Sequence, residues 1–288
     1  MEYNITGHTG LTGLLGSPVA HSISPMMHNE AFRHLGLDYV YLCFDVDTEH
    51  LEDAVLGLKT LHVKGFNCTM PVKNKMFELV DEANEAAKII GAVNTVLNDN
   101  GKLIGYNTDG IGYMRAVKDA GHDIIGKKMT LLGAGGAASA VCTQAAIDGV
   151  SEINVFSIKD NFYERAKKLV DRINKNTKCN VNLIDMADKK ALYDSIESSD
   201  ILTNGTPVGM APNTEQCIIE DEDVFRKDLI VSDVIYNPRE TKLLKIAKSH
   251  GCSTFNGLYM LLYQGAEAFK IWTGKEMPVE LIKNKYFS

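Results

Sequence analysis

Apolar runs of strand length alternate with helical patterns from about residue 9 onward. Apolar runs over residues 11–16, 38–46 and 62–70 are separated by amphipathic stretches over 24–37 and 49–61. Strands that alternate with helices are typical of parallel βαβ units. The pattern therefore predicts an α/β fold for this part of the chain.

The alternation breaks between residues 92 and 109. Two short apolar runs flank Asn98-Asp99-Asn100-Gly101, whose residue types are typical of a β-hairpin turn. We expect this hairpin to close a first domain near residue 108.

A helical pattern over residues 110–122 leads into a second alternating series. Its apolar runs lie at 127–136, 153–157, 180–185, 200–206, 229–236 and 252–255. No internal repeat and no low-complexity linker interrupts the series. The fold class that we predict is α/β, with two α/β domains and an active-site cleft between them, the second domain having a mostly parallel sheet.

Composition and charge exclude several classes of function. The net charge is −7 without a basic stripe, which argues against a nucleic-acid partner. The six cysteines are scattered without a CxxC, and no histidine lies at metal-ligand spacing, so we expect no metal site. Neither a membrane-spanning run nor a signal-peptide pattern is found, and we expect a cytoplasmic protein.

A glycine-rich turn opens the second series. The string "TLLGAGGAASAVCTQAAIDG" places Gly133, Gly135 and Ala138 in a GxGxxA arrangement between an apolar strand and an alanine-rich helix. Such a turn binds a pyrophosphate on the amides of the helix N-terminus. The alternative, a tight strand–helix turn without a ligand, explains the context less well.

The strand after this helix ends at Ser157 and is followed by Ile158, Lys159 and Asp160. An acidic residue about 20 positions after the glycines commonly holds the adenosine ribose 2′-hydroxyl, and Asp160 fits that place. Its charge would repel a 2′-phosphate, whereas Lys159 would attract one. We predict NAD as the cofactor, with NADP tolerated.

Polar side chains collect at the strand ends of the first domain. Each has a structural alternative: Ser24 as a helix cap, Asn94 and Asp109 as turn or cap residues, Lys73 as the start of a solvated helix. Together they supply one amine, one carboxylate and several neutral hydrogen-bonding groups, which suits a small polyhydroxylated acid. The set comprises Ser22, Ser24, Thr69, Lys73, Asn94, Thr108 and Asp109.

Over nearly its whole length the chain resembles the shikimate dehydrogenase family, and most closely the quinate/shikimate dehydrogenase branch. The motifs that carry the resemblance appear in family order: "GSPVAHSISP", "FNCTMPVK", "GAVNT", "GYNTDGIG", "LLGAGGA", "NGTPVGM", "DVIYNPRETKLLKIAKSHG" and "NGLYMLLYQGAEAFKIWTG". The resemblance implies a substrate domain over residues 1–108, completed by helices over 257–288, and a Rossmann-like dinucleotide domain over 109–256.

The resemblance also implies roles for individual residues. Lys73 and Asp109 would be the catalytic pair. Ser22 and Ser24 would hold the substrate carboxylate with Tyr39 nearby, and the substrate hydroxyls would be bound by Thr69, Asn94, Thr108 and Gln264. The cofactor would contact Gly133, Ala134, Gly135, Gly136, Ala137, Ser157, Lys159, Asp160, Thr206, Pro207, Val234, Gly257 and Met260. NADP-dependent members carry an arginine after the second strand of this domain, and "SIK" lacks it, which favours NAD.

The implied reaction is the reversible NAD(P)-dependent oxidation of shikimate to 3-dehydroshikimate, of quinate to 3-dehydroquinate, or of both, in the aromatic amino-acid pathway or quinate metabolism. Lys73 would act either as the acid–base group or as a cation that stabilises the alkoxide. The expected partner is a small-molecule substrate, and a homodimer is allowed. The alternatives are a dinucleotide-binding regulator without turnover and an enzyme similar to methylenetetrahydrofolate dehydrogenase.

Overall fold

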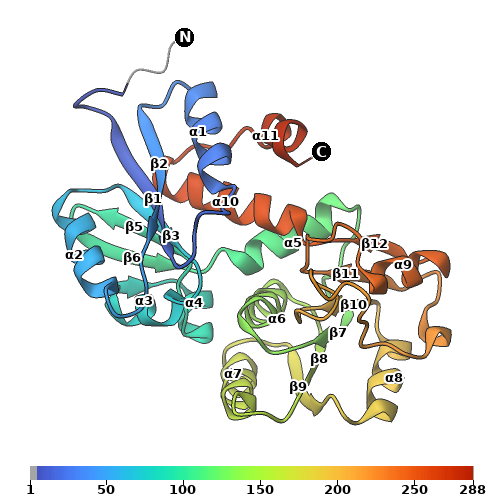
Figure 1. Cartoon of the computed structure of the whole chain (residues 1–288). Coiled ribbons are helices and arrows are strands. Elements are labelled where there is room, and N and C mark those ends of the chain that lie inside the picture. Colours follow the sequence, from blue (N-terminus) through green and yellow to red (C-terminus); the bar gives the residue numbers. More distant parts are fainter. Residues whose placement is uncertain (1–4, 288) are drawn as a thin grey trace. The chain divides into compact units, whose positions relative to one another are not determined.

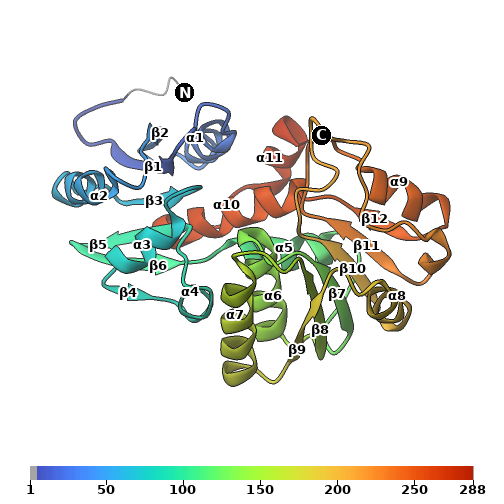
Figure 2. The ribbon, with the colours of Figure 1, turned by 60° about the horizontal axis from the view of Figure 1, so that its bottom comes forward.

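The strands form two separate sheets, and the chain folds into two units around them (Figures 1 and 2). In the computed structural model, which describes residues 5–287, the first unit contains the chain up to Thr108 together with the residues from Leu262 on. The second unit runs from Asp109 to Leu261. The second boundary between these units falls inside helix α10 (Leu258–Thr273), whereas the family resemblance implies a boundary just before Gly257.

The first unit contains a six-stranded mixed sheet in the order β2-β1-β3-β5-β6-β4. Strand β1 is parallel to β2 and β3, whereas β5 is antiparallel to β3 and β6. The predicted βαβ pattern therefore holds for its first three strands, and the hairpin reverses the direction of the next. The strands are β1 (Gly10–Gly16), β2 (Tyr39–Asp45), β3 (Gly65–Cys68), β4 (Glu82–Ala83), β5 (Thr95–Asp99) and β6 (Lys102–Tyr106).

The predicted hairpin joins β5 to β6. Asp99 pairs with Lys102, and the two residues between them, Asn100 and Gly101, have φ values of 52° and 92°. A two-residue turn with positive φ at both positions favours asparagine followed by glycine. The local sequence therefore determines this turn, as predicted.

Two clusters of side chains pack against the first sheet. One joins apolar residues of α2 and α3 to the strands. The other is aromatic and surrounds His28 with Phe32, Tyr41, Phe269 and Trp272, which come from α1, β2 and α10. The helices of this unit are α1 (Ser24–His34), α2 (Leu51–Thr60), α3 (Lys73–Leu79), α4 (Glu85–Ile90), the larger part of α10, and α11 (Val279–Tyr286).

A glycine lets α10 lie directly on the sheet. A Cβ atom on Gly65 would stand 2.3 Å from Nε1 of Trp272, and that nitrogen donates a hydrogen bond of 2.9 Å to the carbonyl oxygen of Val96. This contact explains why the C-terminal helices, red in Figure 1, belong to the same unit as the N-terminal strands.

The second unit contains a fully parallel sheet in the order β12-β11-β10-β7-β8-β9. The chain starts at β7 in the middle, moves outward to β9, and then returns to β10 on the other side, which is the Rossmann order. The elements are α5 (Asp109–Asp119), β7 (Lys128–Leu132), α6 (Gly136–Asp148), β8 (Glu152–Ser157), α7 (Tyr163–Asn176), β9 (Asn180–Asp185), α8 (Lys189–Ser198), β10 (Ile201–Asn204), a 3-10 turn (Glu222–Val224), β11 (Ile230–Asp233), α9 (Lys242–Ser249) and β12 (Ser253–Phe255). The predicted α/β class is confirmed for both units.

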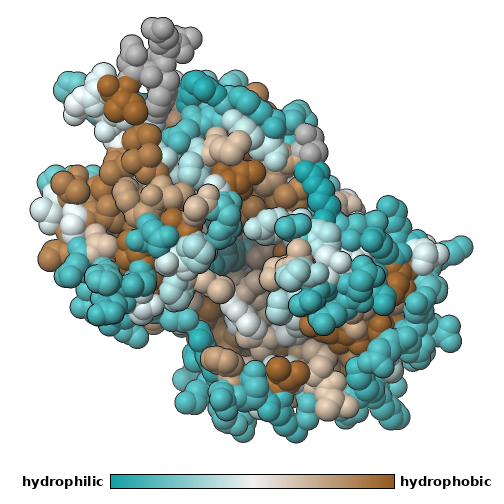
Figure 3. Space-filling view, in the orientation of Figure 1, coloured by the Kyte–Doolittle hydropathy of each residue, from teal (hydrophilic) through white to brown (hydrophobic). Residues whose placement is uncertain are grey.

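Polar and apolar side chains are unevenly distributed over the surface of the two units. Charged and polar side chains cover most of the part of the second unit that is visible in Figure 3, while apolar side chains gather over β1 and β2 of the first. Leu42 of β2 and Leu56 of α2 are exposed apolar residues of this unit. Among residues 5–287, no helix combines the length and the apolar character needed to cross a bilayer.

Candidate active site

The loop with Ser22 and Ser24 lies between the end of β1 and the start of α1. Ser24 is buried and is the first residue of the helix, with Pro25 in the first turn. The N-cap is Ile23, and no side chain caps the helix, so Ser24 does not have the capping role that its position before Pro25 suggests. Its main-chain nitrogen donates to Oγ of Ser22 at 3.2 Å.

Strand β2 presents three side chains to α1 on one face, because alternate residues of a strand point the same way. Burial raises the pKa of the Tyr41 phenol well above its ordinary value, and a hydrogen bond from Ser24 acts in the opposite direction. Burial likewise raises the pKa of the Cys43 thiol against a hydrogen bond from Ser22. Tyr41 and Cys43 are therefore the residues of β2 that meet the two serines.

Tyr39 is not brought to this cluster. Its ring packs against Phe32 with centroids 5.4 Å apart, and Phe32 lies eight residues beyond Ser24 on α1. Eight residues of helix correspond to about 12 Å. The structure thus places Tyr41, which the sequence does not single out, where the resemblance implies Tyr39.

Asn94 and Thr108 form a buried pair at the end of the hairpin strands. Oδ1 of Asn94 accepts from the Thr108 main-chain nitrogen at 2.8 Å, and Nδ2 of Asn94 donates to Oγ1 of Thr108 at 3.0 Å. The hydroxyl of Thr95 lies 3.2 Å from that of Thr108 and donates to Oδ1 of Asn94 at 3.1 Å. These contacts exclude a simple turn role for Asn94.

Lys73 is the first residue of α3 and is half-buried. Its carbonyl oxygen accepts from the Val93 nitrogen at 3.0 Å, which places the Lys73 backbone next to Asn94 in the fold. Burial raises the pKa of the Cys68 thiol to about 12, and the nearby Lys73 ammonium acts in the opposite direction. Thr69 lies between Cys68 and Lys73 in the sequence. A Cβ atom on Gly16, at the end of β1, would stand 2.3 Å from Cγ2 of Thr69, so Thr69 packs closely against that glycine.

Gln264 reaches this unit through α10. A Cβ atom on the next residue, Gly265, would stand 2.2 Å from Cε of Met27 and 3.5 Å from Nε2 of His28. The backbone beside Gln264 therefore lies directly against α1, one turn from Ser24. Residues 240 positions apart in the chain come together because glycine at 265 permits this approach.

Asp109 follows Thr108 in the chain and opens α5 in the second unit. A carboxylate in the first turn is stabilised by the positive end of the helix dipole. Asp109 and Lys73 belong to different units, and their pairing stays a prediction.

The glycine-rich turn of the second unit has the geometry that a pyrophosphate requires. Gly133 has a φ of 96°, and a Cβ atom there would stand 2.7 Å from Cγ2 of Thr206. Gly135 is the N-cap of α6, and a Cβ atom on it would meet no protein atom within 4 Å. Ala138 is fully buried, and its Cβ would stand 2.7 Å from one built on Gly205. The residues present therefore fit a dinucleotide phosphate at the start of α6.

The segment after β8 is exposed beyond Ser157. The Lys159 amine lies 3.0 Å from Oδ2 of Asp185, and hydrogen bonding to that carboxylate raises the pKa of Lys159. Oδ1 of Asp160 accepts from the Phe162 nitrogen at 2.8 Å. The Lys159 charge is therefore balanced by Asp185 at the end of β9, whereas the Asp160 carboxylate faces solvent.

The remaining predicted cofactor residues follow β10, β11 and β12. Thr206 donates to Oδ1 of Asn204 at 2.7 Å, and a Cβ atom on Gly257 would stand 1.9 Å from the carbonyl oxygen of Val234. Pro207 is exposed and Met260 is buried. With the glycine turn, these loops lie at the carboxyl ends of parallel strands on both sides of the point where the strand order reverses.

A buried carboxyl that the sequence does not single out connects these loops. Asp233 accepts hydrogen bonds from Asn204 at 3.1 Å, from the Ile235 nitrogen at 2.9 Å and from Thr241 at 2.8 Å. Burial raises its pKa to about 6. The "DVIYNPRET" motif contains this aspartate and threonine, but only the folded loop shows that they are bonded.

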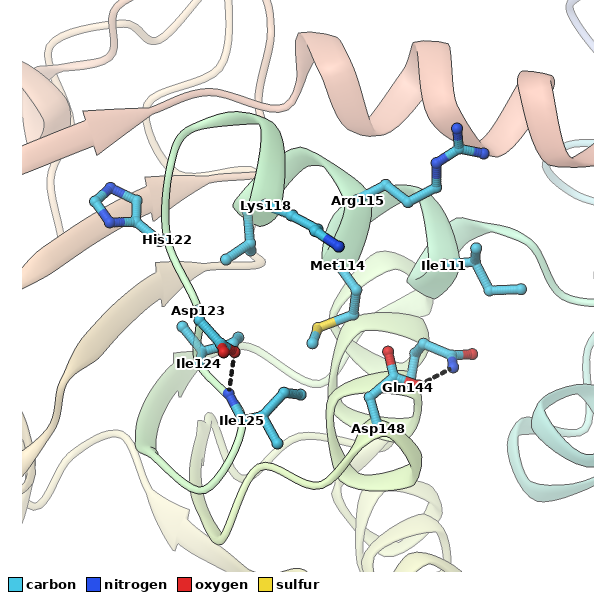
Figure 4. A pocket seen from close by; sticks show the side chains of 11 residues that line it. Ile111, Met114, Arg115, Lys118, His122, Asp123, Ile124, Ile125, Gln144 and Asp148 are labelled. Atoms are coloured by element: carbon cyan, nitrogen blue, oxygen red, sulfur yellow. Dashed lines mark hydrogen bonds between the residues drawn. The ribbon is translucent and has the colours of Figure 1, made fainter. Parts of the chain in front are cut away.

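A groove of about 460 Å³ lies beside α5 in the second unit (Figure 4). Apolar side chains of α5 and of the segment before β7 face each other across it, and Gln144 and Asp148 of α6 form one rim. Asp148 ends the 13-residue helix whose first turn carries the glycine motif, roughly 18 Å away. The groove is therefore distinct from the predicted dinucleotide site. Within the described ranges, no group of three or more His, Cys, Asp or Glu residues could hold a metal ion.

Comparison with known proteins identifies the type of site. Residues 14–96 match the shikimate dehydrogenase substrate binding domain, and residues 257–285 match the shikimate 5′-dehydrogenase C-terminal domain. The chain is 54% identical over 283 residues to a shikimate dehydrogenase (NADP(+)) of Listeria innocua, an alignment that covers 98% of this chain and 97% of the relative.

Solved structures agree with this. Shikimate 5-dehydrogenase from Listeria monocytogenes, in complex with shikimate and NAD, superposes with a TM-score of 0.95 at 54% identity over 97% of each chain. Quinate dehydrogenase from Corynebacterium glutamicum, in complex with NAD, gives a TM-score of 0.86 at 32% identity over 97% of this chain and 99% of that one.

Proposed function

The chain belongs to the shikimate dehydrogenase family, and we propose that it catalyses the reversible oxidation of shikimate to 3-dehydroshikimate with a nicotinamide dinucleotide. The proposal rests above all on the buried Asn94–Thr108 pair, which lies in the same unit as Ser24, Thr69 and Lys73. These side chains offer neutral donors and one cation, which suit a hydroxylated carboxylic acid. The glycine turn of the second unit supplies the matching dinucleotide site.

The chemistry divides between the chain and its cofactor. The glycine turn at the start of α6 would hold the dinucleotide, whose nicotinamide would supply the hydride acceptor for oxidation and the hydride donor for the reverse reaction. Oxidation also removes the proton of the alcohol hydroxyl. Lys73 takes this proton when its amine is neutral, or stabilises the developing alkoxide when it is charged. Asp109, the first residue of α5, would be the carboxylate partner of this amine in the reaction.

NAD is the cofactor that we infer, with NADP as a second cofactor. The Asp160 carboxylate favours a free ribose 2′-hydroxyl, and the Lys159 ammonium is already paired with Asp185. The Listeria monocytogenes structure contains NAD, which supports this choice, whereas the Listeria innocua relative is named for NADP(+). Charge in the exposed segment after β8 is the feature on which the preference between NAD and NADP depends.

Quinate is a further substrate that we infer, because a quinate dehydrogenase shares the fold of both units. We place the protein in the cytoplasm, which agrees with six free thiols. A homodimer remains part of the proposal without a contact assigned to it.

Steady-state kinetics with shikimate and quinate, each against NAD and NADP, test the proposed function. We expect the highest kcat/KM with shikimate and NAD. Lys73→Ala should lower kcat by roughly 10²–10⁴-fold with a small change in KM for shikimate. Lys75→Ala is the matched control, because Lys75 lies in the same helix and pairs with Glu52 at 2.8 Å. Equal turnover in the two variants would remove Lys73 from the mechanism.

A further inference from the structure

Lys159 is the only cationic residue between Ser157, the last residue of β8, and Tyr163, the first residue of α7. It is therefore the one side chain in this segment that could neutralise a 2′-phosphate on an adenosine ribose. Its amine lies 3.0 Å from Oδ2 of Asp185, the last residue of β9, and 6.0 Å from the centre of the Tyr163 ring. The position of the amine is thus set by the end of β9 and the start of α7.

The strand order shows the direction in which Asp185 holds this amine. Strand β8 pairs with β7 on one side and with β9 on the other (Figure 2), and Asp185 is the register partner of Ser157. A pyrophosphate at the glycine turn lies at the end of β7, and its adenosine ribose reaches the end of β8. Neighbouring strands are about 4.8 Å apart, so Asp185 draws Lys159 across β8 and away from the glycine turn.

Asp185 is itself fixed by the loop that follows it. Its Oδ1 accepts from the Ala187 nitrogen at 2.9 Å. The Met186 nitrogen donates to the carbonyl oxygen of Ser157 at 2.9 Å, which joins this loop to the end of β8. The hydrogen bond from Ala187 and the nearby Lys159 ammonium both lower the pKa of the Asp185 carboxyl, so it is charged at neutral pH. The ion pair therefore joins a fixed carboxylate to a flexible lysine.

NAD and NADP make different demands on this ion pair. The 2′-hydroxyl of NAD can donate to Asp160 while Lys159 stays with Asp185. The 2′-phosphate of NADP can be contacted by Lys159 only after the lysine leaves Asp185. The cost is modest, because the Lys159 side chain is 62% exposed and that of Asp185 is 28% exposed. Exposed ion pairs typically change an equilibrium by less than about fivefold.

We propose that Asp185 is a specificity-determining residue, which favours NAD over NADP by holding the Lys159 ammonium on the β9 side of β8. Asp185 acts through Lys159, whereas Asp160 acts on the ribose directly. This inference rests on the proposed function, because it requires a dinucleotide whose adenosine ribose lies at the end of β8.

A double-mutant cycle tests this role through the ratio of the dissociation constants of NAD and NADP, measured by isothermal titration calorimetry. Asp185→Asn keeps the acceptor for the Ala187 nitrogen and removes the charge that holds the lysine. We expect NADP to bind about two- to fivefold more tightly relative to NAD in this variant. The same substitution in a Lys159→Met background should change the ratio by less than about 1.5-fold, because no ammonium is left to release.

Asp194→Asn is the matched control for the loss of charge. It also removes a carboxylate that is paired with an exposed lysine, Lys190, in α8 of the same unit. The ratio of the two dissociation constants should stay at the wild-type value in this variant. The ratio of kcat/KM for the two cofactors, measured with shikimate, should move in parallel with the binding ratio in every variant.

An unchanged binding ratio in Asp185→Asn, or an equal rise with and without Lys159, would overturn the role of Asp185 while leaving the proposed function intact. A wild-type protein that binds both dinucleotides but oxidises no shikimate with either would overturn the proposed function. The binding ratios would still decide the role of Asp185 in that case, because they require no turnover.

Discussion

His28 and Asp233 are buried titratable side chains with opposite effects on stability as the pH changes. Neither ring nitrogen of His28 has a hydrogen-bond partner among the described residues, and burial lowers its pKa to about 3. The unfolded chain therefore binds a proton below about pH 6.5 that the folded unit refuses. Stability from His28 is present at neutral pH and is lost as the pH falls from 6.5 toward 3.

Asp233 behaves in the reverse way. Its folded pKa of about 6 lies above the ordinary aspartate value, so the folded unit binds a proton more readily than the unfolded chain. Its contribution is fully present below the unfolded pKa and is lost as the pH rises through 6. The three hydrogen bonds to Asp233 lower its pKa in the folded unit, but burial raises that pKa by more, so the loss of stability above pH 6 is reduced and not removed.

Urea unfolding at pH 7 and pH 4.5 separates the two effects. The fluorescence of Trp272, the only tryptophan, reports unfolding of the first unit. Between pH 7 and pH 4.5 the wild-type first unit should lose about 2–3 kcal/mol of unfolding free energy, and the His28→Leu variant should not show this loss. Circular dichroism follows the second unit. Between pH 7 and pH 4.5 the wild-type second unit should gain about 2 kcal/mol of unfolding free energy from Asp233, and the Asp233→Asn variant should lack this gain. If each variant keeps the wild-type difference between the two pH values, the assigned pKa shifts are wrong.

We propose that Asp160 sets the cofactor preference by its charge. Asp160→Asn keeps the acceptor for the Phe162 nitrogen and removes the repulsion of a 2′-phosphate. We expect kcat/KM for NADP to rise about tenfold while that for NAD falls. Asp171→Asn, with the same change in net charge on the outer part of α7, should leave the ratio of the two efficiencies unchanged. A ratio that moves equally in both variants would point to net charge and not to this carboxylate.

Helices α5 and α6 approach each other at a glycine. A Cβ atom on Gly110 would stand 2.4 Å from the carbonyl oxygen of Ala140 and 2.5 Å from Cβ of Gln144. Gly110 directly follows Asp109, so the close approach of the helices also fixes the backbone of the proposed catalytic carboxylate. Gly57 of α2 offers a contrast, because a Cβ atom there would meet nothing within 4 Å.

Alanine substitution distinguishes these two helical glycines. Gly110→Ala must push α5 away from α6, and we expect it to destabilise the second unit by about 1–3 kcal/mol and to lower kcat. Gly57→Ala should stabilise the first unit by about 0.5–1 kcal/mol with unchanged kinetics, because alanine restricts the unfolded chain. Chemical denaturation and steady-state kinetics of both variants check this. A neutral Gly110→Ala would show that the two helices have room to separate.

Turns that depend on residue types at fixed spacings were predictable from the sequence. Side-chain contacts that depend on how a helix packs on a strand were not. The hairpin at Asn100 and the turn at Gly133 follow from residue types at fixed offsets. Tyr39 and Tyr41 lie on the same face of β2, so the alternating pattern cannot tell which one meets Ser24. The packing of α1 on β2 decides it, and that packing depends on residues far along the chain, such as Gly265 against Met27.

The division of the whole chain into two units was likewise predictable only where local sequence patterns determine it. The parallel sheet of the second unit was predictable because strands and helices alternate regularly. The return of the C-terminal helices to the first unit came only from the family resemblance, since nothing local in α10 indicates that Trp272 packs over Gly65. The proposed chemistry needs both units, because Lys73 belongs to one and the glycine turn to the other.

Transfer of deuterium tests the central claim most directly. Shikimate labelled with deuterium at the oxidised ring carbon would be incubated with the purified protein and NAD, and the reduced cofactor would be analysed by mass spectrometry. Hydride transfer at one site predicts a single deuterium on the nicotinamide of every reduced molecule, with almost none formed by Lys73→Ala in the same time. A protein that binds NAD and shikimate yet returns both unlabelled and unreacted would contradict the account.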